Sequence, residues 1–358
     1  MVTKNYCSLS FRRFLFVRLA MIFIVLSAVL LITIALLGST MDDILRRNVK
    51  LNVIDEVSHN TKLNASFRTI EERQNYIENQ IKIQIHTQGL DEPWYSPKSL
   101  GTKFFKTLTL DLGRSLFLTS DSGSQDVSTI IMEKLPKTIL LFTTSTIIIT
   151  FIGLYLGAFS ASKAGSLVDR FTSASAVFSS SVPTFYIGMM MILVFAFIYP
   201  IFPARATPLT APTDPDYIFD LLYHMTLPLL TIILVGFGGW AYIARYFVLT
   251  VLNEDFIAAK RAQGISEKKV IYSHTLKNAA PPIIITIGLA LSASLGGALL
   301  TEKVFNWPGM GMLYFDAISV MDTPVIVGQT YVLVLIFLIT IFIVDLMYQY
   351  FDPRVKVG

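Results

Sequence analysis

The sequence is short of charge, cysteine and histidine, and each shortage argues against a class of protein. Only 15% of its 358 residues are charged and 53% are hydrophobic, which argues against a disordered chain and against an ordinary soluble domain. A single cysteine, Cys7, excludes an internal disulfide. The histidines, His59, His86, His224 and His274, are scattered and therefore do not predict a metal centre.

Motifs for catalysis and nucleotide binding are also missing. The sequence contains no G-x-x-x-x-G-K-[ST] phosphate loop, no H-E-x-x-H, no G-x-S-x-G and no cysteine pair. It therefore predicts no catalytic, cofactor or metal site on this chain. The net charge of +4 comes from short basic clusters beside apolar runs rather than from a basic stripe with interleaved aromatics. This pattern indicates orientation in a membrane and argues against nucleic-acid binding.

Long apolar runs are what the sequence has instead. Because about 20 apolar residues span a bilayer as a helix, the pattern predicts an all-α membrane protein with about six transmembrane helices. The predicted spans are 14–38, 136–160, 174–199, 224–248, 283–301 and 325–348. The first run is longer than the core of a signal peptide, so we expect it to remain as a span.

Charge and small residues add detail to these spans. Short basic loops all fall on one side, which places the N-terminus (1–13) and the tail (351–358) in the cytoplasm. Gly153 and Gly157 predict close helix contact in the second span, and Pro183 predicts a kink in the third. Asp345 is the clearest charge within a span, and we expect it to lie near the inner end of its helix.

Residues 39–135 form the one long hydrophilic segment between spans, which predicts a small extracytoplasmic domain between helices 1 and 2. Within it, residues 67–85 are expected to be helical, because isoleucines recur on one face from Ile70 to Ile85. We expect that isoleucine stripe to pack inside the domain.

A second polar segment, the coupling loop 249–282, separates the fourth and fifth spans. We call its residues 253–282 the platform. Good helix formers up to Gln263 predict a first short helix that ends at a left-handed Gly264. Ser266 is a good N-cap for a second short helix, and Pro281 is expected to begin the next element. These residues alone fit either a solvated loop or a docking platform for another protein.

Motifs in the platform and beyond it resemble one family. The platform contains A-A-x-x-x-G and is similar to D-[FY]-[VI]-x-x-A-[RK]-A-x-G-[LIV]-S-E, with Lys260 as a departure. Residues 302–311, EKVFNWPGMG, and the closing Asp352-Pro353-Arg354 are similar to further motifs of that family. The chain from Gly89 to Lys356 thus resembles the membrane subunits of binding-protein-dependent ABC importers, in the oligopeptide, dipeptide and nickel branch. The resemblance does not extend to residues 40–88.

The resemblance implies a permease subunit in the cell membrane that works with several partners. These would be a homologous second permease, two ABC ATPases that bind ATP and magnesium, and an extracytoplasmic substrate-binding protein. It implies peptides as substrates ahead of oligosaccharides or nickel. It also implies that the platform couples to the ATPases, with Ala259, Arg261 and Ala262 on the buried face of the first short helix. The implied coupling residues are Asp255, Phe256, Ala258, Ala259, Arg261, Ala262, Gly264, Ser266, Glu267 and Pro282.

Two other classes remain open from the residues alone. An ion-driven secondary transporter usually needs buried carboxylates, histidines or broken helices that bind ions, and the predicted spans contain no string of such groups. A membrane sensor would bind its ligand on the segment 39–135, but a sensor needs few spans. Both features favour a bundle that is driven by a partner on its cytoplasmic side.

Overall fold

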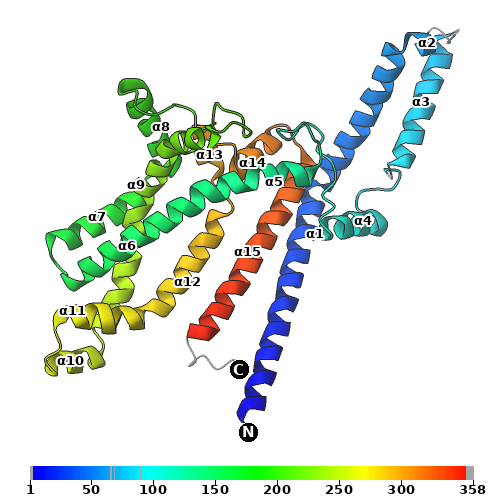
Figure 1. Ribbon diagram of the computed structural model, residues 1–358. Coiled ribbons are helices and arrows are strands. Elements are labelled where there is room, and N and C mark those ends of the chain that lie inside the picture. The colour runs from blue at the N-terminus through cyan, green and yellow to red at the C-terminus, as the bar shows by residue number, and fades with distance from the viewer. Residues whose placement is uncertain (1–2, 65–66, 68, 89, 352–358) are drawn as a thin grey trace. The chain divides into compact units, whose positions relative to one another are not determined.

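The computed structural model describes residues 3–64, 67, 69–88 and 90–351, and this part of the chain is built from helices (Figure 1). Five of its helices are long and apolar enough to cross a membrane, or six if a bent pair counts as one span. The prediction of an all-α membrane protein is confirmed. The closing motif, Asp352-Pro353-Arg354, lies outside the described residues.

The chain divides into two compact units. Unit 1 comprises Met1–Ile22, Ile131–Asp316 and Val332–Gly358, and unit 2 comprises Phe23–Ile130 and Ala317–Tyr331. Unit 1 therefore holds the platform and most of the predicted permease core (136–350). Unit 2 holds most of the predicted extracytoplasmic domain.

The helices follow one another along the chain, with longer irregular connections before α5 and before α9. They are α1 (Thr3–His59), α2 (Thr61–Asn64), α3 (Ile70–Thr87), α4 (Pro97–Leu108), α5 (Val127–Thr138), α6 (Thr144–Ser162), α7 (Leu167–Ser181), α8 (Thr184–Ile192), α9 (Tyr217–Leu252), α10 (Asp255–Ala262), α11 (Glu267–Lys269), α12 (Leu276–Ser294), α13 (Leu299–Phe305), α14 (Met310–Ser319) and α15 (Thr323–Phe351). Three π-helical turns connect some of them: η1 (Ile139–Thr143), η2 (Leu193–Ile198) and η3 (Val270–Thr275).

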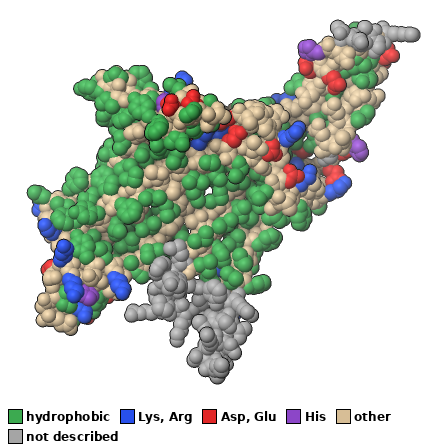
Figure 2. Space-filling view, in the orientation of Figure 1, with side chains coloured by type: hydrophobic (Ala, Val, Ile, Leu, Met, Phe, Trp, Pro, Cys, Tyr) green, Lys and Arg blue, Asp and Glu red, His purple; other side chains and the backbone are tan. Residues whose placement is uncertain are grey.

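Unit 1 is organised around the contact between α6 and α9. A Cβ added at Gly153 would lie 2.6 Å from the Cβ of Trp240, and one added at Gly157 would lie 2.7 Å from the Cβ of Ala244. Only glycine allows helices to approach this closely, so the small-residue pair predicted from the sequence does position α6 against α9. The helices between the two ends of this unit carry mostly hydrophobic side chains on the face that Figure 2 shows.

The predicted third span, 174–199, is two helices rather than one. Helix α7 begins earlier than expected, at Leu167, and the axis bends by 94° between α7 and α8. Pro183 explains the break, because proline lacks the N–H for a helical hydrogen bond and disfavours the helical conformation in the residue before it. Val182 is accordingly extended, with φ −112° and ψ 122°.

Several predicted boundaries differ from the observed ones because apolarity locates a span but not the end of its helix. Helix α1 does not end near residue 38 but continues to His59, where Val49, Val53 and Val57 stay buried at helical spacing. Pro281 lies inside α12 rather than at its beginning, and α12 ends at Ser294 rather than near residue 301. Spans predicted at 136–160, 224–248 and 325–348 all lie within longer helical stretches.

The structure also bears on two expectations about side chains. Asp345 lies close to the end of α15, as expected, and it also pairs with Arg18, with 3.2 Å between the carboxylate and the guanidinium. The isoleucine stripe on α3 is not a fully buried face: Ile70 is exposed, and Ile77, Ile81 and Ile85 are half-buried.

Unit 2 is tied together by the carboxylate of Asp322, which is fully buried. It accepts hydrogen bonds from the Ser115 hydroxyl at 2.6 Å and from the backbone N–H of Phe117 at 2.9 Å, among others. These contacts join the loop after α4 to the segment before α15.

Candidate functional site

The first half of the platform folds as the sequence predicts. Helix α10 follows α9 after two residues, Asn253 and Glu254, and ends at Ala262, with Gln263 as its C-cap. Gly264 then takes φ +74°, and its N–H donates to the Arg261 carbonyl at 2.9 Å. An L-residue reaches this left-handed region only at a cost, so the glycine allows the chain to turn here.

The second half of the platform is the beginning of a span rather than a separate short helix. Ser266 has the extended backbone of an N-cap residue, although its side chain caps no N–H. From Glu267 the helix continues through α11, η3 and α12 to Ser294, and this whole stretch is apolar and long enough to cross a membrane. A motion of the platform would therefore be transmitted directly along a span.

A buried apolar cluster holds the platform to three spans, and we call it the anchor cluster. Ile257 of α10 is fully buried at its centre. Phe256 and Ile265 pack against the cluster from either side of the turn. The cluster consists of Ala158, Ala161, Val248, Val251, Leu252, Ile257, Val270, Ile271, Ala279 and Ile283. Since these residues come from α6, α9, α10, η3 and α12, α10 is packed against the bundle instead of hanging in solvent.

The coupling residues implied by the resemblance lie mostly on the other face of the platform. The exposed ones are Asp255, Ala258, Ala259, Arg261, Ala262, Gly264, Ser266 and Glu267, whereas Phe256 is half-buried and Pro282 lies within α12. The expectation that Ala259, Arg261 and Ala262 are buried is wrong for this chain. The helix turns about 100° per residue, and Ile257 occupies the inward position.

An ion pair braces the turn across Gly264. The Arg261 guanidinium donates to the Glu267 carboxylate at 2.7 Å. Both side chains are about half exposed, so the pair contributes little to stability, about 0–1 kcal/mol. Its location suits a geometric role, because it joins α10 to the first turn of the next helix. Lys and Arg side chains gather at this end of unit 1 in Figure 2.

A second charge cluster next to the platform was missed from the sequence. The Asp169 carboxylate at the start of α7 accepts from the Arg245 guanidinium of α9, from the Ser160 hydroxyl at 2.8 Å and from the Gly165 N–H at 2.8 Å. It ties the loop after α6 to the end of α9. The available signal was not local: a basic residue near the end of the fourth predicted span and an acidic residue just after the second, both expected on the cytoplasmic side.

The motif EKVFNWPGMG forms a buried, hydrogen-bonded cluster at the opposite end of unit 1 from the platform (Figure 1), and we call this cluster the lock. The Glu302 carboxylate is fully buried and accepts from the Thr138 hydroxyl at 3.2 Å and from the Met312 N–H at 3.0 Å. Burial in this site, which lies outside the spans, raises the pKa of Glu302 to about 7. The Trp307 indole, also buried, donates to the Lys137 carbonyl at 3.1 Å.

This lock explains the glycines of the motif. A Cβ on Gly311 would lie 2.8 Å from the backbone nitrogen of Leu299, closer than side chains tolerate, and 3.0 Å from the carboxyl carbon of Glu302. The motif therefore joins α13 to α5 and serves structure. Among the described residues, no group of three or more His, Cys, Asp or Glu could hold a metal ion.

The geometry defines a class. This is a multi-pass membrane protein whose helix bundle holds a platform between two spans, with one face of the platform packed against the bundle and the other exposed. Comparison with known proteins identifies the family. Residues 153–357 match the model of the inner membrane component of binding-protein-dependent transport systems. The chain belongs to this family.

Individual relatives cover most of the chain. An oligopeptide transport system permease protein of Bacillus subtilis is 33% identical over 274 residues, 76% of this chain and 84% of the relative. A dipeptide transport system permease protein of Lactococcus lactis is 30% identical over 282 residues, 77% of this chain and 86% of the relative. A putative peptide permease protein of Brucella suis is 36% identical over 250 residues, 69% and 76% of the two chains.

Proposed function

We propose that this chain is a membrane-spanning subunit of an ATP-driven importer of oligopeptides or dipeptides. The support for the transport class is family membership, and the support for peptides is that relatives covering most of the chain are named as oligopeptide and dipeptide permeases. Oligosaccharides and nickel, the other cargoes considered from the sequence, have no such support among these relatives.

The observation that carries the mechanism is the platform's two faces. One face, centred on Ile257, is buried in the anchor cluster, and the other exposes Ala259, Arg261 and Glu267. A partner that binds the exposed face and moves on ATP hydrolysis pushes α10. Because side chains of the anchor cluster come from α6, α9 and α12, the push reaches three spans together. These spans then rock to open the pathway alternately to either side of the membrane.

The partners follow from this mechanism. Two ABC ATPases bind the ATP and magnesium and engage the platforms of this chain and of a homologous second permease. An extracytoplasmic binding protein delivers the peptide. The beginning of α1 and the end of α15 lie on the same side of unit 1 as the platform (Figure 1). This supports a cytoplasmic position for the platform and for these two helix ends.

Cysteine cross-linking tests the docking surface. In a Cys7→Ser background, Ala259→Cys introduces a thiol on the exposed face of α10, and Thr102→Cys introduces one at an exposed position on α4. A short cross-linker with a maleimide at one end and an amine-reactive ester at the other, applied to the assembled transporter, should link Ala259→Cys, and not Thr102→Cys, to lysines of an ATPase subunit. Equal linkage at both positions, or none at Ala259→Cys, would refute the assignment.

A further inference from the structure

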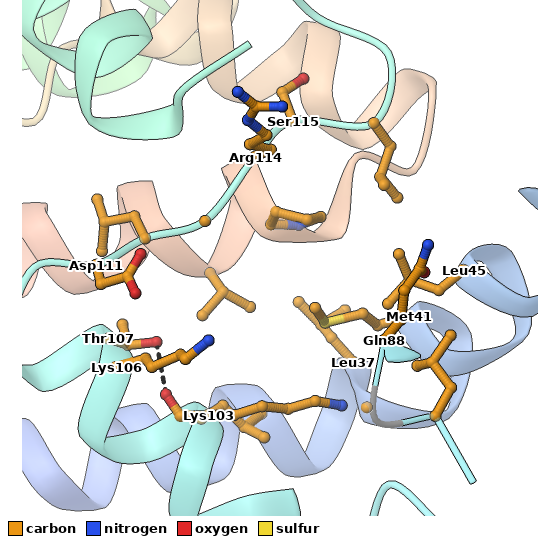
Figure 3. Close-up of a pocket in the computed structure, with 18 residues that line it drawn as sticks. Leu37, Met41, Leu45, Gln88, Lys103, Lys106, Thr107, Asp111, Arg114 and Ser115 are labelled. Carbon is orange, nitrogen blue, oxygen red and sulfur yellow. Dashed lines mark hydrogen bonds between the residues drawn. The ribbon is translucent and has the colours of Figure 1, made fainter. Parts of the chain in front are cut away.

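Unit 2 contains a cavity of about 520 Å³ that the transport mechanism does not use. It lies between α1, α4, the loop after α4 and the beginning of α15, and all of its lining residues belong to unit 2 (Figure 3). Cavities of about 300–1,000 Å³ are typical of small-molecule sites in proteins. We call it the unit 2 pocket.

The lining of the unit 2 pocket is amphipathic. One part is apolar and includes Leu37, Met41 and Leu112. The other part is basic: Lys103 and Lys106 extend into the pocket from α4 in Figure 3, and Arg114 lines it from the following loop. The lining thus contains three cations and one carboxylate, Asp111, and carries an excess of positive charge.

The cations have few partners within the described residues. Lys103 approaches the buried Asp42 carboxylate at 3.7 Å but makes no hydrogen bond, although its ammonium nitrogen is inaccessible to water. Asp42 also pairs with Arg46, at 3.5 Å. Lys106 is exposed and forms no ion pair with any described residue. A buried ammonium without a hydrogen-bond acceptor is costly, so Lys103 would gain from turning its ammonium toward an anionic ligand in the pocket, beside the exposed Lys106.

The position of the unit 2 pocket along α1 indicates where the ligand comes from. Up to Leu36, α1 exposes large apolar side chains, as a helix in contact with lipid does. Charged residues begin at Asp42 and Asp43, which places the pocket level, residues 34–45, at the boundary between hydrocarbon and water. Basic side chains at this boundary attract anionic lipid headgroups.

We infer that the unit 2 pocket binds an anionic amphiphile, and that this amphiphile is a membrane lipid with an acidic headgroup. The headgroup lies against Lys103 and Lys106, and the upper part of one acyl chain lies against Leu37, Met41 and Leu112. The bound lipid connects α1 to α4 and to the beginning of α15.

Lipid binding to the purified full-length chain tests this inference by native mass spectrometry. Phosphatidylglycerol should bind more tightly than phosphatidylcholine, and glycerol phosphate, which has the charge but no acyl chains, should not bind. Each Lys at such a surface is worth a factor of about 5, so Lys103→Gln/Lys106→Gln should weaken phosphatidylglycerol binding by about 30-fold. The matched control Lys50→Gln/Lys82→Gln removes two exposed lysines of unit 2 outside the pocket and should bind as the wild type does.

Every other outcome overturns the inference in a defined way. Equal binding of both lipids, or equal loss in the control variant, shows no specific anion site. Binding of glycerol phosphate as tight as that of phosphatidylglycerol identifies a free-phosphate site instead of a lipid site. The single variant Lys106→Glu is the second test, in case the double variant does not fold, because this side chain is exposed and unpaired among the described residues. Unchanged phosphatidylglycerol binding in Lys106→Glu also refutes the inference.

Discussion

Replacing Gly264 tests how the turn of the platform controls coupling. Gly264 has φ +74°, and no atom lies within 4 Å of a Cβ added there. Its N–H donates to Arg261. A substitution at this position therefore changes backbone conformation without causing a clash, so its effect reports on the turn alone.

The expected costs form a series. Gly264→Asn should be tolerated best, because asparagine visits the left-handed region. Gly264→Ala costs about 1–2 kcal/mol, which corresponds to a shift of roughly 5- to 30-fold in the local equilibrium. Gly264→Pro cannot adopt the turn at all, since proline fixes φ near −65°, and it also removes the hydrogen bond to Arg261, worth about 0.5–1.5 kcal/mol.

The assay is peptide uptake and ATP hydrolysis by the complete transporter in proteoliposomes, with membrane insertion of each variant measured in parallel. We expect Asn to retain coupled uptake, Ala to lower it, and Pro to abolish it while insertion stays normal. Normal coupled uptake in Gly264→Pro would refute the role of the turn. A defect in Gly264→Asn as severe as that in Gly264→Pro would show that the backbone angle is not what matters.

Three further predictions concern the residues that support the platform and the opposite lock. Ile257→Ser should disrupt the anchor cluster at a cost of about 2–5 kcal/mol in stability and so uncouple ATP hydrolysis from uptake. Ile257→Val should cost about 0.5–1.5 kcal/mol and remain coupled. Equal uptake in both variants would contradict this. Glu302 binds a proton more tightly in the folded protein, because its pKa rises from 4.5 to about 7 on folding. Its protonated form therefore adds about 3 kcal/mol to the free energy of unfolding below pH 4.5, and this contribution is lost as the pH rises to 7. The Tm of the wild type should thus fall over this range relative to that of Glu302→Gln, and parallel Tm profiles would disprove it. Arg245→Ala leaves the mostly buried Asp169 carboxylate without its cation and should lower the Tm, whereas Arg245→Ala/Asp169→Asn should recover part of the loss; no recovery in the double variant would argue against the pairing.

Local chemistry made the first half of the platform predictable. A run of good helix formers followed by a glycine specifies a short helix and a left-handed turn without help from the rest of the chain. The direction in which α10 faces was not predictable in this way. Ile257 is the buried residue because α6, η3 and α12 supply an apolar surface for it, and α6 lies far from α10 in the sequence.

Other differences also come from tertiary context. Pro281 reads as the beginning of a helix, yet it lies inside α12, where a π-helical turn, η3, precedes it and the helix is packed in the bundle. The Asp169–Arg245 pair joins residues 76 positions apart, and no local pattern reports such a contact. The apolar runs, by contrast, located the helices that can cross a membrane, because burial in lipid is recorded in composition alone.

The central claim is that this helix bundle supplies no energy for transport itself and that partner ATPases drive it through the platform. Uptake by proteoliposomes tests it most directly, with this chain reconstituted alone and with the second permease, the ATPases and the binding protein. We predict uptake only in the complete assembly and only with ATP. Sustained peptide accumulation by the chain alone, without any nucleotide-hydrolysing subunit, would contradict the claim.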